Sequence, residues 1–130
     1  GLPVLANRTG GISGPALKPL ALRCVYEICA GLDIPVIGTG GVASGLDTIE
    51  MLSVGATAVG VGTAVAASGD GAFARIVDEL GGWMLARGIG RLDELRGRAH
   101  HARGGAAVPG ARGSRETRLP PVPGWRPHEG

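Results

Sequence analysis

The chain has 130 residues, 44% of them apolar and 3% aromatic, with a formal net charge of +2. This length suits one ordinary domain but falls far short of the about 250 residues of a closed (βα)8 barrel. No apolar run reaches the about 18 residues that a membrane-spanning helix needs, and the start shows no secretory signal. We therefore expect a cytoplasmic globular protein without a membrane partner, and the first residue, Gly1 rather than Met, suggests a fragment.

Charge and complexity divide the chain near Gly97. Residues 1–97 carry seven basic and nine acidic side chains, whereas residues 98–130 carry six arginines and two glutamates. Gly, Pro, Arg and Ala dominate the second part, which has too little apolar surface to offset the entropy of ordering. We expect an ordered domain over 1–97 and a disordered tail over 98–130. The tail lacks aromatic interleaving and any nucleic-acid motif, so no nucleic-acid partner is expected.

A loop, a helix and a strand are expected first. Residues 1–14 have the glycines and small polar residues of a loop. Prolines 15 and 19 predict the start of a helix, because proline is tolerated in a first turn, and Gly31 is expected near its end. Residues 34–37 then form an apolar run without polar alternation, which is typical of a strand buried on both faces of a parallel sheet.

A second helix, a second strand and a longer helix follow. Ser44 is expected to cap the helix that ends at Gly55, with Asp47 placing negative charge in its first turn. The strand is expected over 56–61, the longer helix over 71–86 and a helical turn over 92–96. The expected apolar stripes are Leu46, Ile49 and Leu52 in the first of these helices, and Phe73, Ile76, Val77, Leu80, Trp83 and Met84 in the longer one.

The order of elements is loop, α, β, α, β, α and tail. Alternation of this kind predicts an α/β fold with parallel strands and crossover helices. Two strands cannot close a barrel or form a self-sufficient sheet. The ordered part is therefore expected to be the last quarter to third of a larger α/β unit.

Glycine-rich turns directly follow both predicted strands. They are Gly38-Thr39-Gly40-Gly41 and Gly60-Val61-Gly62-Thr63, and Gly40 lies 22 positions before Gly62. Loops that follow parallel strands meet at one edge of the sheet, and backbone N–H groups gathered there bind phosphate. We expect the N–H groups of Gly40, Gly41, Gly62 and Thr63 to donate to a phosphate. The hydroxyls of Thr63 and Ser13 are expected to add further bonds.

Isolated polar residues suggest little chemistry. Lys18 is either a phosphate or substrate lysine or a solvated residue at a helix start, and the second interpretation is favoured. Cys24 and Cys29 lie five positions apart in a predicted helix and point in different directions, which favours two reduced thiols. The pair His100-His101 lies in the low-complexity part and predicts no metal site.

Carboxylates do not form a recognisable catalytic group. Asp33, Asp47 and Glu50 have the positions of loop or helix-surface residues. Trp83 lies on the apolar stripe of the longer helix and is expected to be a core residue. The sequence shows no Ser-His-Asp grouping, carboxylate pair or cysteine nucleophile in a suitable setting. It therefore predicts a site for a cofactor phosphate with no catalytic residue and no metal ligand.

These motifs closely resemble the C-terminal part of dihydroorotate dehydrogenase. The resemblance runs from residue 3 through Gly10-Gly11-Ile12-Ser13-Gly14-Pro15-Ala16-Leu17-Lys18-Pro19 and both glycine turns, and continues more loosely to Gly97. The Ser13–Pro19 segment resembles the soluble class 1 enzymes, most of all the NAD-dependent class 1B catalytic subunit. Gly81-Gly82 and the tail depart from the family pattern.

The resemblance implies an FMN-dependent (βα)8 TIM barrel that oxidises dihydroorotate to orotate in pyrimidine biosynthesis. It implies FMN contacts at Gly14, Gly40, Gly41, Gly62 and Thr63, with the last four on the phosphate. The family's flavin lysine, cysteine base and substrate asparagines would precede residue 1, so the 130-residue chain alone is expected to be inactive. A partner subunit carrying FAD and an iron–sulfur cluster would pass electrons to NAD, within a homo- or hetero-oligomer.

Two alternatives stay open. The first is that the chain belongs to another flavin- or phosphate-binding barrel with such paired turns, for example dihydropyrimidine dehydrogenase. The second is that the chain is a non-catalytic, truncated segment that associates with another chain or stays partly unfolded.

Overall fold

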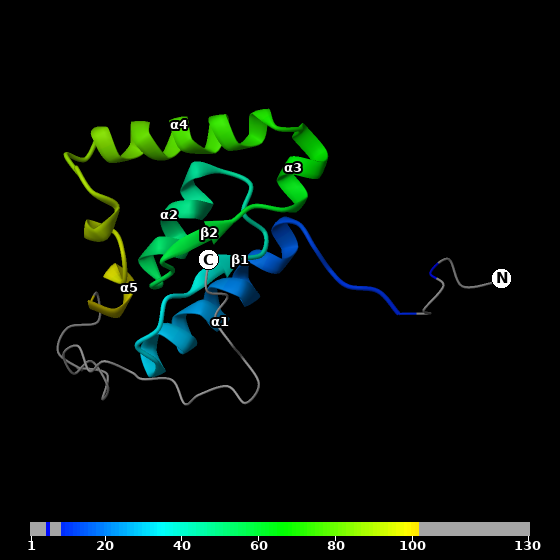
Figure 1. Cartoon of the computed structure of the whole chain (residues 1–130), viewed down its shortest axis with the longest axis horizontal. Coiled ribbons are helices and arrows are strands. Elements are labelled where there is room, and N and C mark those ends of the chain that lie inside the picture. Colours follow the sequence, from blue (N-terminus) through cyan, green and yellow to red (C-terminus); the bar gives the residue numbers. More distant parts are fainter. Residues whose placement is uncertain (1–4, 6–8, 102–130) are drawn as a thin grey trace, which may run out of the picture.

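Two short parallel strands form the centre of the fold (Figure 1). The computed structural model describes residue 5 and residues 9–101. Strand β1 (Ile37–Thr39) pairs with β2 (Ala58–Gly60), so that Ile37 lies opposite Ala58 and Thr39 opposite Gly60. Helix α2 (Gly45–Ser53) connects the two strands. The predicted α/β fold with a parallel crossover unit is confirmed.

Further helices surround this unit. The 3-10 helix η1 (Pro15–Leu17) and helix α1 (Lys18–Gly31) precede it, as the paired prolines predicted. Figure 1 shows α2 with α4 along one side and α1 along the other. The helices after β2 are α3 (Thr63–Ser68), α4 (Gly71–Leu85), η2 (Leu92–Glu94) and α5 (Arg98–His101).

The strands are shorter than predicted, and β1 begins later. The bounds predicted for the first strand, 34–37, are wrong, since pairing with β2 starts only at Ile37. Pro35 has no N–H to donate to a ladder, and the Val36 carbonyl accepts from Thr57 N at 2.8 Å and Ala58 N at 3.4 Å just outside it. Gly38 and Thr39 therefore belong to the strand, and the turn that follows is Gly40–Ser44.

The prediction that the first strand is buried on both faces is also wrong. Gly38 is buried on the side of α2, whereas Ile37 on the opposite face is 70% exposed. Ile34 is 47% exposed. Within the part of the chain that the structure describes, helices cover one face of this sheet, so alternate residues of β1 face solvent.

The start of α2 follows its local sequence. Ser44 Oγ accepts the N–H of Asp47 at 3.2 Å, which confirms the predicted cap. Gly55 adopts a φ of +111° after the last turn, the left-handed conformation that glycine favours at a helix end. Of the predicted stripe, Ile49 and Leu52 are buried, but Leu46 is 54% exposed, because α2 turns Met51 rather than Leu46 toward the sheet.

The segment after β2 holds two helices rather than one. In addition to the longer helix predicted over 71–86, a separate helix α3 begins directly at Thr63 and ends before Gly69, whose φ is +69°. Helix α4 confirms the longer helix. It lies on α2 with Ala72 and Ile76 buried, so Phe73 and Val77 of the predicted stripe are more than half exposed.

Two apolar clusters hold the elements together. The first joins α1, α2 and the sheet, and its buried residues are Val25, Val42, Met51 and Ala56. The second joins α2 to α4 and the segment after it, and its buried residues are Ile49, Leu52 and Leu95, with Leu80, Trp83 and Met84 partly buried beside them. Trp83 is thus a partly buried member of the core.

A short helix follows the predicted domain boundary at Gly97. Residues 98–101 form α5, and the His100 ring stacks on Tyr26 of α1 with centroids 4.2 Å apart. His100 Nε2 lies 3.0 Å from the Val54 carbonyl oxygen. These tertiary contacts order a segment of poor local composition. The rest of the predicted tail, 102–130, lies outside the described residues. None of the helices in the described part is long and apolar enough to cross a bilayer.

Candidate functional site: a glycine-lined cavity

A cavity of about 400 Å³ opens at the carboxyl ends of β1 and β2. It brings together all five predicted site residues and Ser13 from three separate loops. Gly14 meets Thr63 there, since a Cβ placed on Gly14 would lie 3.7 Å from Thr63 Cγ2. The residues that line the cavity include Ser13, Gly14, Thr39, Gly40, Gly41, Ala43, Gly60, Gly62, Thr63, Ser68 and Arg75.

Backbone N–H groups supply donors at this cavity. Among the residues that the structure describes, the N–H groups of Gly41 and Gly62 have no hydrogen-bond acceptor. A Cβ placed on Gly62 would meet no atom within 4 Å, so the space in front of this residue is open. Unpaired donors beside open space are the requirement of an anion site.

Gly41 is the residue at which the turn needs glycine most. Its φ is +73°, and a Cβ there would lie 2.6 Å from the backbone nitrogen of Lys18. Because Lys18 begins α1, the turn after β1 packs directly against the helix that follows the Gly10–Gly14 loop. The close approach brings two of the three cavity loops together.

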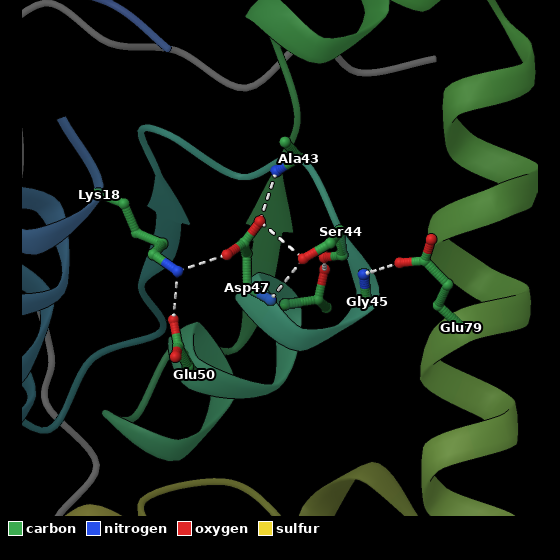
Figure 2. Close-up of polar contacts among 8 residues, drawn as sticks. Lys18, Ala43, Ser44, Gly45, Asp47, Glu50 and Glu79 are labelled. Carbon is green, nitrogen blue, oxygen red and sulfur yellow. Dashed lines mark hydrogen bonds and ion pairs between the residues drawn. The ribbon is translucent and has the colours of Figure 1, made fainter. Parts of the chain in front are cut away.

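Asp47 organises the turn Gly40–Ser44 from its far end. Its Oδ2 accepts the N–H of Ala43 at 2.9 Å and the hydroxyl of Ser44 at 2.8 Å (Figure 2). The prediction of a surface carboxylate is wrong for this residue, which is only 9% exposed. It sits in the first turn of α2 on the side that faces α1, so the tertiary fold buries it.

Lys18 is paired rather than solvated. Its Nζ lies 2.5 Å from Asp47 Oδ1 and 2.8 Å from Glu50 Oε2. The interpretation of Lys18 as a solvated residue is therefore wrong, and Glu50 is more than an isolated surface carboxylate. The lysine does not line the cavity, so its charge acts on the carboxylates of α2.

Arg75 and Glu79 of α4 hold the same segment from the other side, and the sequence analysis missed both. Arg75 lines the cavity, and its Nη2 donates to the Ala43 carbonyl at 3.0 Å. Glu79 Oε2 accepts the N–H of Gly45 at 2.7 Å, while its Oε1 pairs with Arg75 at 3.0 Å. The i,i+4 spacing of Arg75 and Glu79 was a visible signal for their pairing, but not for their contact with residues more than 30 positions away.

The polar contacts shift the pKa values of three groups. Burial raises the pKa of Asp47, but hydrogen bonds from Lys18, Ala43 and Ser44 outweigh it and hold that pKa below its ordinary value. Hydrogen bonds from Gly45 N–H and Arg75 lower the pKa of Glu79. Hydrogen bonds to Asp47 and Glu50 raise the pKa of Lys18.

The depressed pKa of Asp47 predicts an acid-sensitive contribution to stability. A carboxylate with a lowered folded-state pKa stabilises the fold above its unfolded pKa, about 3.9 for Asp, and loses this contribution as the pH falls through the folded value. We therefore expect the free energy of unfolding to decline below pH ~4, and the decline to be shallower in Asp47→Asn. Urea unfolding at a series of pH values measures both slopes, and parallel curves would contradict the assignment.

The remaining candidates form no second site. Cys24 is exposed and Cys29 partly buried on α1, both as free thiols, and burial raises the pKa of Cys29. Asp33 is exposed in the loop before β1. Over residue 5 and residues 9–101, no three His, Cys, Asp or Glu side chains gather into a group that could hold a metal ion.

Comparison with known proteins identifies relatives of the chain. The family model described as dihydroorotate dehydrogenase matches residues 2–84. A relative from Methanothermobacter thermautotrophicus is 47% identical over 98 residues, and one from Staphylococcus carnosus is 47% identical over 100. Both are named dihydroorotate dehydrogenase B (NAD(+)), catalytic subunit. The matches cover 75% and 77% of this chain but only 32% of each relative, so the chain spans about a third of their length.

A solved structure gives the same result for the fold. The ligand-free dihydroorotate dehydrogenase from Eimeria tenella superposes with a TM-score of 0.66 at 31% sequence identity. The superposition covers 72% of this chain and 26% of that one. The neighbour is a TIM barrel, so the α/β unit described above corresponds to part of such a barrel. By sequence and by fold, the chain belongs to the dihydroorotate dehydrogenase family.

Proposed function

We propose that the chain forms the phosphate-binding end of an FMN site in a dihydroorotate dehydrogenase. The family is flavin-dependent. The observation that carries the proposal is the convergence of Gly14, Gly40, Gly41, Gly62 and Thr63 on one cavity at the carboxyl ends of two parallel strands. In α/β barrels this edge holds the active site, often with a phosphate bound after the last strands.

The residues present suit the phosphate of FMN. The unpaired N–H groups of Gly41 and Gly62 would donate to phosphate oxygens, with Gly40 and the hydroxyls of Thr63 and Ser13 beside them. Arg75 at the cavity wall would add positive charge near the dianion. Bound FMN would supply the hydride acceptor for the oxidation of dihydroorotate to orotate. This chain's residues would anchor the cofactor and exclude water from its phosphate.

We base the proposed substrate and electron acceptor on the names of the relatives. The relatives' names designate a catalytic subunit and NAD. We infer that the protein works beside an electron-transfer subunit with FAD and an iron–sulfur cluster, in the cytoplasm. Because the chain spans about a third of the length of these relatives, we expect the 130-residue chain alone to leave dihydroorotate unchanged.

A chimeric enzyme tests the proposal. The 98 aligned residues of the Methanothermobacter thermautotrophicus relative are replaced by the matching residues of this chain. We expect the chimera to retain FMN through purification and to form orotate from dihydroorotate, which absorbance measures. Loss of FMN from a folded chimera would contradict the proposed cofactor site. Uracil reduction in place of orotate formation by the full-length protein would favour a dihydropyrimidine dehydrogenase.

A further inference from the structure

The carboxylate of Asp47 makes two hydrogen bonds to the turn Gly40–Ser44. Its Oδ2 accepts from both Ala43 N and Ser44 Oγ, so a single oxygen joins two consecutive residues of the chain between β1 and α2 (Figure 2). Gly40, Gly41 and Ala43 of this turn line the cavity. The Asp47 carboxylate therefore holds part of one cavity wall.

Lys18 holds the same carboxylate from its other side. Its ammonium contacts the other oxygen, Oδ1, and also Glu50 Oε2 at 2.8 Å. The lysine and aspartate side chains are 26% and 12% exposed, so water screens this pair far less than an open surface pair. Lys18 is the first residue of α1, four positions after Gly14. The ion pair thus connects the first cavity loop to the second.

The same two segments also meet through their backbones. A Cβ on Gly41 would lie 2.6 Å from the nitrogen and 2.9 Å from the Cα of Lys18. The backbone contact between Gly41 and Lys18 limits the distance between the start of α1 and the turn. The ion pair between Lys18 and Asp47 acts on the orientation of the turn. Because Lys18 and Asp47 lie outside the cavity lining, neither would touch a ligand bound there.

We propose that Lys18 and Asp47 are positioning residues that hold the turn Gly40–Ser44 in its phosphate-binding conformation. The proposal rests on the proposed function for its ligand, the FMN phosphate, but its structural part concerns the turn alone. It predicts that removing the lysine charge loosens the turn and weakens recognition of the phosphate, while contacts to the flavin ring are unaffected.

Hydrogen exchange in the full chain tests the structural part. We expect Lys18→Met to speed exchange of the Ala43 amide at least tenfold, with amides 76–80 of α4 changed less than twofold. Arg23→Met is the matched control, since it removes an exposed ion pair with Glu27 from the same helix, and it is expected to change neither region. No change at Ala43, or an equal rise throughout the chain, would overturn the proposal.

A second variant covers the case in which Lys18→Met does not fold. Lys18→Gln keeps a hydrogen-bond donor for Asp47 but removes the charge. We expect it to speed exchange at Ala43 relative to the parent chain, again without a change at 76–80. Exchange at Ala43 equal to that of the parent chain would contradict a role for the charge.

Ligand affinity separates this proposal from the proposed function. FMN and riboflavin differ by the phosphate, and quenching of flavin fluorescence measures both dissociation constants. We expect Lys18→Met to raise the FMN dissociation constant at least tenfold and to leave that of riboflavin unchanged. A parent chain without preference for FMN would count against the proposed function, while the exchange result would still decide the positioning role. A parent chain with this preference, retained in full by Lys18→Met, would overturn the positioning role alone.

Discussion

Replacing Gly41 with alanine is expected to destabilise the fold by about 2–4 kcal/mol and to abolish FMN binding. The φ of +73° costs an L-residue about 1–2 kcal/mol. The new Cβ would also lie 2.6 Å from the backbone nitrogen of Lys18, where no flexible side chain can move aside. Relief of this contact requires the turn to separate from α1. The phosphate donors would then leave their positions.

Gly81→Ala is the matched control for Gly41→Ala. Gly81 lies inside α4, and a Cβ there would meet no atom within 4 Å. Alanine favours a helix interior over glycine by about 1 kcal/mol, so this variant is expected to be slightly more stable than the parent chain. Urea unfolding measures both free energies, and retention of FMN during purification of the chimera measures binding. Equal effects of the two substitutions would contradict the conformation assigned to the turn.

Leu95→Ala is expected to destabilise the fold by about 2–5 kcal/mol. Leu95 is 0% exposed and packs on Ile49 and Leu52 of α2. The chain next to it is fixed by the bond from Gly97 N to the Leu52 carbonyl at 3.0 Å. Such an anchored segment cannot collapse fully into the space that the truncated side chain leaves, and the cost of a core truncation grows with the residual cavity.

Leu92→Ala provides the comparison for this prediction. Leu92 lies three positions earlier and is 43% exposed, so its truncation is expected to cost less than about 1 kcal/mol. The midpoint of urea unfolding is expected to fall far more for Leu95→Ala than for Leu92→Ala at similar slopes. Similar midpoints would show that the segment after α4 does not belong to the core.

Local patterns predicted the elements where neighbours in sequence decide the structure. The cap of α2 needed only Ser44 and Asp47, which are three positions apart, and the left-handed end at Gly55 needed only glycine. The alternation of strands and helices was sufficient for the parallel topology, because a short crossover connection permits few arrangements. The glycine-rich turns indicated which residues would line the site, since parallel strands bring their following loops to one edge.

The contacts that shape the cavity wall depend on the tertiary structure. Asp47 and Glu50 had the pattern of surface carboxylates, but α1 brings Lys18 to both, across 29 positions in the case of Asp47. Arg75 and Glu79 contact the turn and the start of α2 only because α4 lies along α2. Likewise, His100 lies beyond the boundary that composition indicated for the ordered domain, and its contacts come from packing on Tyr26 of α1. The burial of Leu95 comes from packing on Ile49 and Leu52 of α2. Helical and strand periods specify which way a side chain points along its own element, but the partner across an interface depends on how separate elements pack.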